Sequence, residues 1–199
     1  TISPSLSYAK AKRVVDLFLA VLMLPFFTVI ILLAALIVKL ESRGPAFFVQ
    51  ERMGFRGKTF KILKLRTMRV ETGKQLSFTE ANDPRITRIG KFLRKFRVDE
   101  LPQIINIFAG QMSWIGPRPE AIDLSEKYED AIPFYSYRHI VRPGITGWAQ
   151  VNQGNVGDVE AAMTKLNYDF YYIKYFSPWL DVMITVKTIA IMLTGFGSR

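Results

Sequence analysis

Residues 17–38 read LFLAVLMLPFFTVIILLAALIV, a run of 22 residues that contains no charged side chain. Asp16 precedes the run and Lys39 closes it. At about 1.5 Å of rise per residue, a helix of this length can cross the ~30 Å hydrocarbon core of a bilayer. This stretch decides the fold class, because it predicts a membrane helix near the start of the chain.

Pro25 interrupts the apolar run, and basic residues flank the run on both sides: Lys10, Lys12, Arg13, Lys39 and Arg43. Basic flanks mark the cytoplasmic side of a membrane helix, so this pattern favours both ends on one side. A proline removes one backbone hydrogen bond and bends a helix. We therefore predict a re-entrant membrane helix over residues 1–40 that bends at Leu24-Pro25, with a straight span as the alternative.

The composition limits the chemistry of the chain. Its 199 residues favour one sizeable domain, and 49% of them are hydrophobic. No cysteine and a single histidine, His139, exclude a disulfide framework, a thiolate metal site and an imidazole cluster, so any metal must be held by oxygen. The chain has a net charge of +10, and the positive charge is concentrated in residues 39–98, which hold sixteen basic and five acidic groups. Such a segment suits phosphates, nucleic acid or anionic lipid headgroups.

Several shorter elements follow the apolar run. Two β-rich stretches, residues 47–51 and 60–66, surround a turn at 54–57 and predict a hairpin. Asn82-Asp83-Pro84 predicts the start of a basic amphipathic helix near 84–98, and apolar and aromatic residues predict another amphipathic helix near 178–194. Both helices suit a membrane interface, although surface or core packing explains either pattern almost as well. The predicted fold is α+β, mainly helical and membrane-associated.

The candidate chemistry lies in three blocks. Asp99-Glu100 begins a predicted helix that ends at Gly110, directly after the basic helix. Helix starts and cations attract phosphate, whereas capping alone is the other interpretation. The stiff turn Gly116-Pro117-Arg118-Pro119 presents one guanidinium, which is a bidentate partner for phosphate. Residues 142–152, RPGITGWAQVN, form the third block.

Together with residues 61–68, KILKLRTM, these blocks resemble the bacterial sugar transferase family, the monotopic polyprenyl-phosphate hexose-1-phosphate transferases. The resemblance covers nearly the whole chain. It includes the N-terminal apolar segment, the stretch from Gly44-Pro45 to Gly54 and the Asp169-Phe170-Tyr171-Tyr172 motif, in order.

The resemblance implies a transferase that moves a sugar-1-phosphate from a UDP-sugar to polyprenyl phosphate. Asp99 would attack the β-phosphorus and form a covalent aspartyl sugar-phosphate, while Glu100 would hold Mg²⁺. An aspartate of ordinary pKa, about 3.9, needs no base to become a nucleophile at neutral pH. The remaining candidates are Arg94, Arg118 and Arg142 for substrate phosphates, and Asp169, Gln150 and Asn152 as possible further site residues.

The expected location is the bacterial inner membrane, with residues 41–199 as a catalytic domain on the cytoplasmic face. The expected partners are the UDP-sugar, polyprenyl phosphate and the lipid bilayer, and self-association as a homo-oligomer stays open. The apolar run argues against a nucleic-acid partner. Two alternatives remain: a polyprenyl diphosphate phosphatase, and a basic peripheral membrane scaffold without enzymatic activity.

Overall fold

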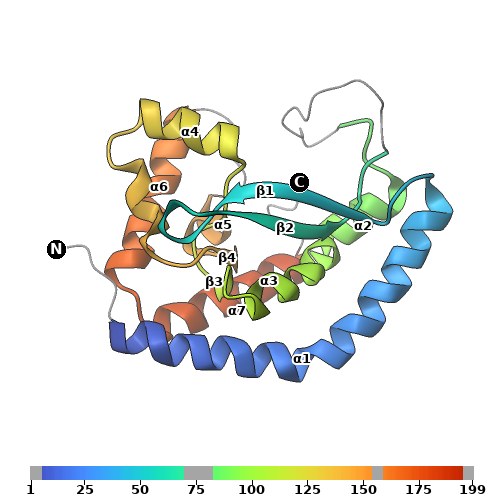
Figure 1. Cartoon of the computed structure of the whole chain (residues 1–199), viewed down its shortest axis with the longest axis horizontal. Coiled ribbons are helices and arrows are strands. Elements are labelled where there is room, and N and C mark those ends of the chain that lie inside the picture. The colour runs from blue at the N-terminus through green and yellow to red at the C-terminus, as the bar shows by residue number, and fades with distance from the viewer. Residues whose placement is uncertain (1–5, 70–82, 154–158, 195–199) are drawn as a thin grey trace.

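The computed structural model describes residues 6–69, 83–153 and 159–194. Its first element, α1 (Leu6–Glu41), is one helix of 36 residues with Pro25 inside it. Figure 1 shows α1 lying along the lower edge of the molecule and then turning upward. A proline near the middle of the helix supplies the physical cause of this bend. Among the described residues, α1 is the one helix long and apolar enough to cross a membrane by length and composition. The re-entrant topology stays a prediction.

Both halves of α1 pack onto the rest of the chain. In the first half, Ala20 joins a buried cluster with Ile62 and Ile107. In the second half, Val38 joins a different cluster with Leu65. The remaining surface of α1 is apolar and largely exposed. The helix is therefore attached to one body along its length and leaves a broad apolar face uncovered.

The predicted hairpin is confirmed. Strands β1 (Phe47–Met53) and β2 (Thr59–Leu65) pair antiparallel, with Phe47 opposite Leu65 and Met53 opposite Thr59. The short 3-10 helix η1 (Phe55–Gly57) closes the turn, with Arg56 and Gly57 both in the left-handed region. Phe60 and Ile62 point into the core below the hairpin.

The basic helix begins later than predicted. Helix α2 spans Arg88–Lys95, and the side chain of Thr87 caps it by accepting a hydrogen bond from the Gly90 amide at 2.9 Å. Pro84 lies in a turn before the helix, and Asn82 lies outside the described residues. The helix therefore begins at the threonine cap, which accepts a hydrogen bond from a free amide of the first turn, and not at the proline.

The helix predicted from Asp99 to Gly110 is divided into two elements. Residues Val98–Gln103 form the 3-10 helix η2, and α3 spans Ile104–Phe108. Gly110 ends the segment at φ 77°, as predicted, because glycine adopts the left-handed region without steric cost.

The remaining elements complete the fold, and two of them contact α1 through Ser113 and Asp181. Strands β3 (Ser113–Ile115) and β4 (Gly144–Thr146) form a short parallel pair that the sequence did not indicate. Helices α4 (Ile122–Ala131) and α6 (Val159–Lys174) surround the 3-10 helix η3 (Tyr135–Ile140). Helix α5 (Trp148–Asn152) follows β4, and α7 (Pro178–Thr194) lies where the second amphipathic helix was predicted.

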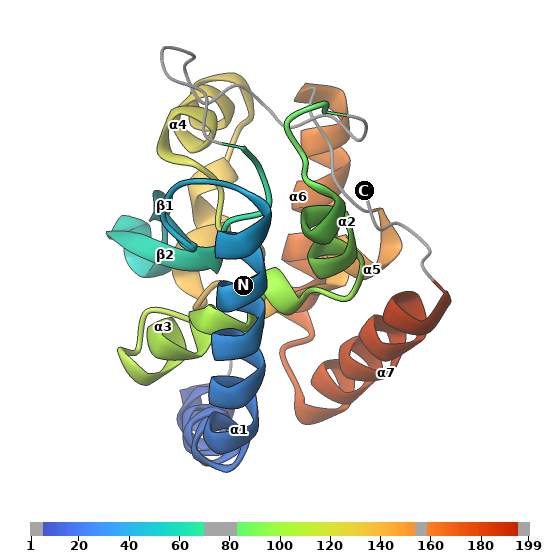
Figure 2. The same ribbon diagram turned by 90° about the vertical axis from the view of Figure 1, so that its right-hand side faces the viewer.

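Most of the large apolar side chains that are exposed belong to α1, α3 and α7. Figure 1 and Figure 2 show α1, α3 and α7 low in both views and α4 at the opposite side. Exposed residues of this kind include Phe18, Leu32, Ile105, Trp179 and Leu193. Monomeric soluble proteins seldom expose an apolar surface of this extent, so the pattern is typical of a membrane or protein contact. The fold is mainly helical with a small antiparallel hairpin, in agreement with the predicted class.

Candidate functional site

Asp99 and Glu100 lie in the first turn of η2, directly beneath the hairpin. Arg97 precedes this turn in the left-handed conformation, at φ 54°, and so redirects the chain after α2. The side chains of both acidic residues are buried, with 9% and 5% exposure. Buried carboxylates are costly unless charged or hydrogen-bonding groups compensate them, so their surroundings determine what they can do.

Glu100 is surrounded by three cations. Its Oε1 accepts hydrogen bonds from Lys64 Nζ at 3.0 Å and from Arg118 Nη1 at 2.9 Å, and its Oε2 accepts one from Arg97 Nη1 at 3.4 Å. Burial alone would raise the pKa of Glu100, but Arg118, Lys64 and Arg97 outweigh it and hold that pKa well below its usual range. Glu100 is therefore ionised throughout the physiological pH range.

Asp99 has a different environment. Within the described ranges, its carboxylate has no hydrogen bond and no ion pair. Burial and the neighbouring charge of Glu100 raise the pKa of Asp99 to about 6, against the opposing influence of Lys64, Arg94 and Arg118. The group is still mostly ionised at pH 7. A buried, ionised and unpaired carboxylate near several cations can act as a nucleophile.

Arg94 and Arg118, two of the predicted phosphate-binding residues, lie in this site. Arg94 Nε donates to Thr67 Oγ1 at 2.8 Å, and its positive charge acts on Asp99. Lys64 and Arg97 belong to the site as well, although neither was assigned a role from the sequence. Lys64 is in phase with Phe60 and Ile62 along β2, so the period of two along a strand already placed its side chain on the inward face.

Arg142 is not brought to the acidic pair. Its Nε donates to the carbonyl of Gly110 at 3.0 Å, and its guanidinium lies 5.2 Å above the centre of the Phe55 ring. These contacts lie at the far end of α3 from Asp99. Phosphate binding by Arg142 stays a prediction, and in this arrangement its guanidinium contacts a carbonyl and an aromatic ring.

The other three candidates also bond residues outside the acidic pair. Gln150 Nε2 donates to the carbonyl of Ile145 at 3.1 Å, and Asn152 bonds the carbonyl of Trp148 and the ammonium of Lys187. Asp169 is 1% exposed and pairs with Arg138. None of these contacts reaches Asp99 or Glu100 directly, so the structure places these candidates outside the acidic pair's immediate surroundings.

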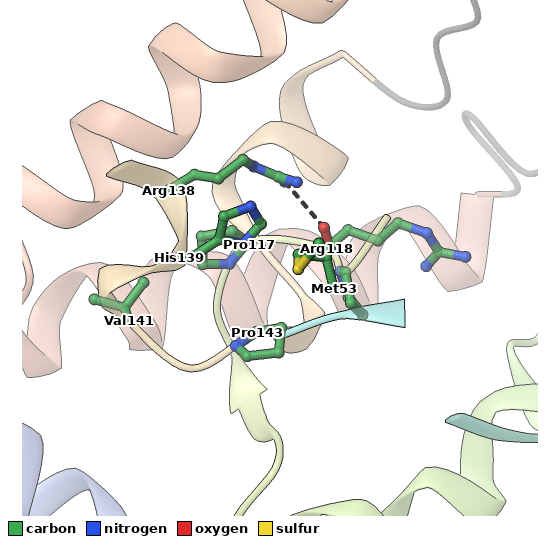
Figure 3. Close-up of a pocket in the computed structure, with 8 residues that line it drawn as sticks. Met53, Pro117, Arg118, Arg138, His139, Val141 and Pro143 are labelled. Carbon is green, nitrogen blue, oxygen red and sulfur yellow. Dashed lines mark hydrogen bonds between the residues drawn. The ribbon is translucent and has the colours of Figure 1, made fainter. Parts of the chain in front are cut away.

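Arg138 connects Asp169 to the site, and no sequence pattern indicated it. Its Nε and Nη2 both donate to Asp169 Oδ2, at 2.9 and 2.7 Å, and Nη2 also donates to the backbone carbonyl of Arg118 at 2.9 Å. Figure 3 shows this last bond across a pocket lined by Pro117, His139 and neighbouring residues. The buried ion pair thus supports the backbone of an arginine whose side chain contacts Glu100.

Magnesium fits the acidic pair by its donor chemistry. Mg²⁺ prefers oxygen ligands and is commonly held by one or two carboxylates together with substrate phosphates and water. Asp99 and Glu100 supply two adjacent carboxylates, and among the described residues there is no group of three or more acidic, histidine or cysteine side chains that could hold a metal. A metal at this site would therefore depend on ligands from the substrate.

These features define a chain with a long apolar helix and a buried acidic pair surrounded by cations. The model of the bacterial sugar transferase family matches residues 7–195, and the chain belongs to this family. A UDP-N-acetylgalactosamine-undecaprenyl-phosphate N-acetylgalactosaminephosphotransferase from Aeromonas hydrophila is 49% identical over 98% of the chain and 47% of the relative. A UDP-glucose:undecaprenyl-phosphate glucose-1-phosphate transferase from Escherichia coli (strain K12) is 43% identical over 89% of the chain and 39% of the relative.

The chain spans less than half the length of these two relatives. A third relative has a comparable length: an exopolysaccharide production protein PSS from Rhizobium leguminosarum bv. phaseoli is 40% identical over 92% of the chain and 95% of the relative. The matched region therefore corresponds to part of some relatives and to nearly all of another.

Proposed function

We propose that the protein transfers a sugar-1-phosphate from a UDP-sugar to polyprenyl phosphate, such as undecaprenyl phosphate, through a covalent intermediate on Asp99. This would be a first membrane step in the assembly of a bacterial glycan. The observation that carries the proposal is the contrast between the two adjacent carboxylates. Glu100 is neutralised by three cations, whereas Asp99 is ionised, buried and unpaired. The relatives are named for a UDP-sugar and undecaprenyl phosphate, and these names suggest the class of both substrates.

The first step would form a bond between an Asp99 carboxylate oxygen and the β-phosphorus of the UDP-sugar. The bond from that phosphorus to the bridging oxygen breaks, and UMP leaves with the electron pair. No proton has to be removed from Asp99, because its carboxylate is already ionised at pH 7. Lys64, Arg94 and Arg118 would stabilise the negative charge on the phosphate oxygens, which usually contributes the largest part of phosphoryl-transfer catalysis.

In the second step, an oxygen of polyprenyl phosphate attacks the same phosphorus and the Asp99 carboxylate leaves. The product is a polyprenyl diphosphate sugar, and the enzyme returns to its initial state. Glu100 would hold Mg²⁺, which when bound reduces the repulsion between a carboxylate and the substrate diphosphate. A long isoprenoid substrate also explains why the site lies close to an exposed apolar surface.

The proposed location is the cytoplasmic face of the bacterial inner membrane. The apolar surfaces of α1, α3 and α7 support the membrane contact in this proposal, since each exposes large aliphatic or aromatic side chains. The UDP-sugar would then arrive from the cytoplasm, and the lipid substrate would arrive within the bilayer.

A UMP-release screen tests the function. Purified protein is mixed with undecaprenyl phosphate, magnesium and one of four donors: UDP-glucose, UDP-galactose or their N-acetylated forms. We expect UMP from at least one donor and none from Asp99→Asn. In a parallel reaction with undecaprenyl diphosphate as the substrate, release of inorganic phosphate would identify a phosphatase. No turnover in either reaction would support the scaffold alternative.

A further inference from the structure

A small cavity lies under the hairpin, directly beside Glu100. It is lined by Arg52, Ile62, Lys64, Gln103, Arg118, Pro119 and Gly144. Lys64 and Arg118 are the two residues that bond Glu100 Oε1. The cavity therefore continues the cationic surroundings of the acidic pair toward β1 and β4.

Two buried donors of this cavity have no partner. Gln103 is 2% exposed, and its Nε2 makes no hydrogen bond within the part of the chain that the structure describes. Arg52 Nε is equally unpartnered there, although Arg52 Nη1 bonds the Pro119 carbonyl and Nη2 bonds Gln50 Oε1. A buried donor without an acceptor costs about 1–3 kcal/mol, so such a donor needs an explanation.

The charge around the cavity is positive. Arg52, Lys64 and Arg118 are mutually repulsive, and none of the lining residues is acidic. Burial, and next the charge of Arg118, lower the pKa of Arg52 to about 10, so it stays protonated at pH 7. Two nearby carboxylates offset only part of this charge: Glu100 also pairs with Arg97, and Glu120, which acts on Arg52 and Arg118, pairs with Lys165. An anionic oxygen would relieve the repulsion and satisfy the two free donors at once.

We propose that this cavity is an oxyanion subsite, in which Gln103 Nε2 and Arg52 Nε donate hydrogen bonds to an oxygen of a phosphate group. The identity of that phosphate rests on the proposed function: it would belong to the diphosphate of the nucleotide sugar or to the polyprenyl phosphate. The binding of a phosphate anion itself does not depend on the reaction. Gln103 and Arg52 thus join Lys64 and Arg118 as substrate-binding residues.

Calorimetric titration of the full chain in detergent micelles with inorganic pyrophosphate, at low ionic strength and without UDP-sugar, tests the subsite. Gln103→Glu replaces the free donor by an acceptor of the same size and adds a negative charge. The matched control is Gln111→Glu at the end of α3, where Oε1 accepts from Asn106 and can continue to do so. We expect Gln103→Glu to weaken pyrophosphate binding by at least about tenfold, or ~1.4 kcal/mol, and Gln111→Glu by less than about twofold.

Arg52→Lys provides a second, independent variant. It keeps the positive charge but removes the Nε donor, so pyrophosphate affinity should fall severalfold while the melting temperature stays close to that of the wild type. Unchanged affinity in both folded variants would overturn the subsite and leave an internal water as the occupant of the cavity. Absence of pyrophosphate binding to the wild type would overturn it as well.

The outcome also separates this inference from the proposed function. Pyrophosphate binding that depends on Gln103, together with no UMP release from any donor, would retain the subsite and reject the transferase. UMP release with unchanged KM values for both the UDP-sugar and polyprenyl phosphate in Gln103→Glu and Arg52→Lys would retain the transferase and reject the subsite.

Discussion

Arg138 Nη2 donates a hydrogen bond to the backbone carbonyl of Arg118 at 2.9 Å, while the Arg118 side chain bonds Glu100. The same Nη2 bonds Asp169. The guanidinium therefore connects a buried ion pair to the backbone of a site residue, and Arg138 is expected to act as a positioning residue through Arg118.

Arg138→Lys should lower kcat for UMP release by about tenfold. A lysine keeps the charge that Asp169 needs, but its single ammonium cannot reproduce the fork that reaches both Asp169 and the Arg118 carbonyl. In an Arg118→Ala background, the same change should have little further effect on kcat. Such non-additivity distinguishes action through Arg118 from a general loss of stability.

Arg66→Lys, alone and combined with Arg118→Ala, is the matched control for this double-mutant comparison. Arg66 is another buried arginine that bonds backbone carbonyls, those of Ser42 and Arg43 at the end of α1. Its effect should add to that of Arg118→Ala. If the effects of Arg138→Lys and Arg118→Ala on kcat are also fully additive, Arg138 does not act through Arg118 and the positioning role is rejected.

Local sequence patterns predicted the elements whose signals are continuous along the chain. The uncharged run predicted α1, and two β-rich stretches around a turn predicted the hairpin. The parallel pairing of Ser113 with Gly144 could not be predicted, because each strand has three residues and the pairing depends on contacts 31 positions apart. Asp99 and Glu100 were found from neighbouring motifs.

The roles of individual arginines were harder to predict. Arg142 was assigned to phosphate binding from its place in a motif, but its partners, Gly110 and Phe55, come from other segments of the chain. Arg138 was missed for the same reason, since its partners Arg118 and Asp169 lie 20 and 31 positions away. Nothing in the neighbouring sequence distinguishes a structural arginine from one that binds substrate.

Asp99→Asn should abolish activity and raise stability. Burial and Glu100 penalise the charged form of Asp99, so its ionisation at pH 7 costs the folded state on the order of 3 kcal/mol. A neutral amide of the same size removes this cost, and the melting temperature should rise by several degrees. Mass spectrometry of the wild type with UDP-sugar alone should show a sugar-phosphate adduct on the peptide with residue 99, and the variant should show none. A less stable variant with normal UMP release would contradict both assignments.

The rate of UMP release should depend on the ionisation of Asp99. Because its pKa is raised to about 6, the rate should fall about tenfold per pH unit below pH 6 and level off above pH 7. Glu100→Gln removes a neighbouring negative charge and leaves three cations unbalanced, so the pKa of Asp99 should fall and the acid limb should move to lower pH. The pH profile of kcat/KM for both proteins measures this shift. An acid limb that stays in place would show that another group controls it.

The two ends of α1 should lie on the same side of the membrane. Near the N-terminal end, Lys12 bonds Asp181 of α7 at 2.5 Å; near the C-terminal end, Arg66 bonds the Ser42 carbonyl at 2.7 Å. Both contacts attach α1 to one charged body. A straight span would have to break one of them or draw charged groups into the hydrocarbon core, which costs several kcal/mol per group.

Cysteine labelling tests this topology. The chain has no cysteine, so a single introduced cysteine reports its own position. Lys10→Cys and Arg43→Cys should both react with an impermeant maleimide in inside-out vesicles. Neither should react when the maleimide is added to the outside of intact spheroplasts. Leu32→Cys, in the apolar run, should be protected from both sides. Labelling of positions 10 and 43 from opposite sides would establish a straight span and show that one of the two attachments does not persist in the membrane.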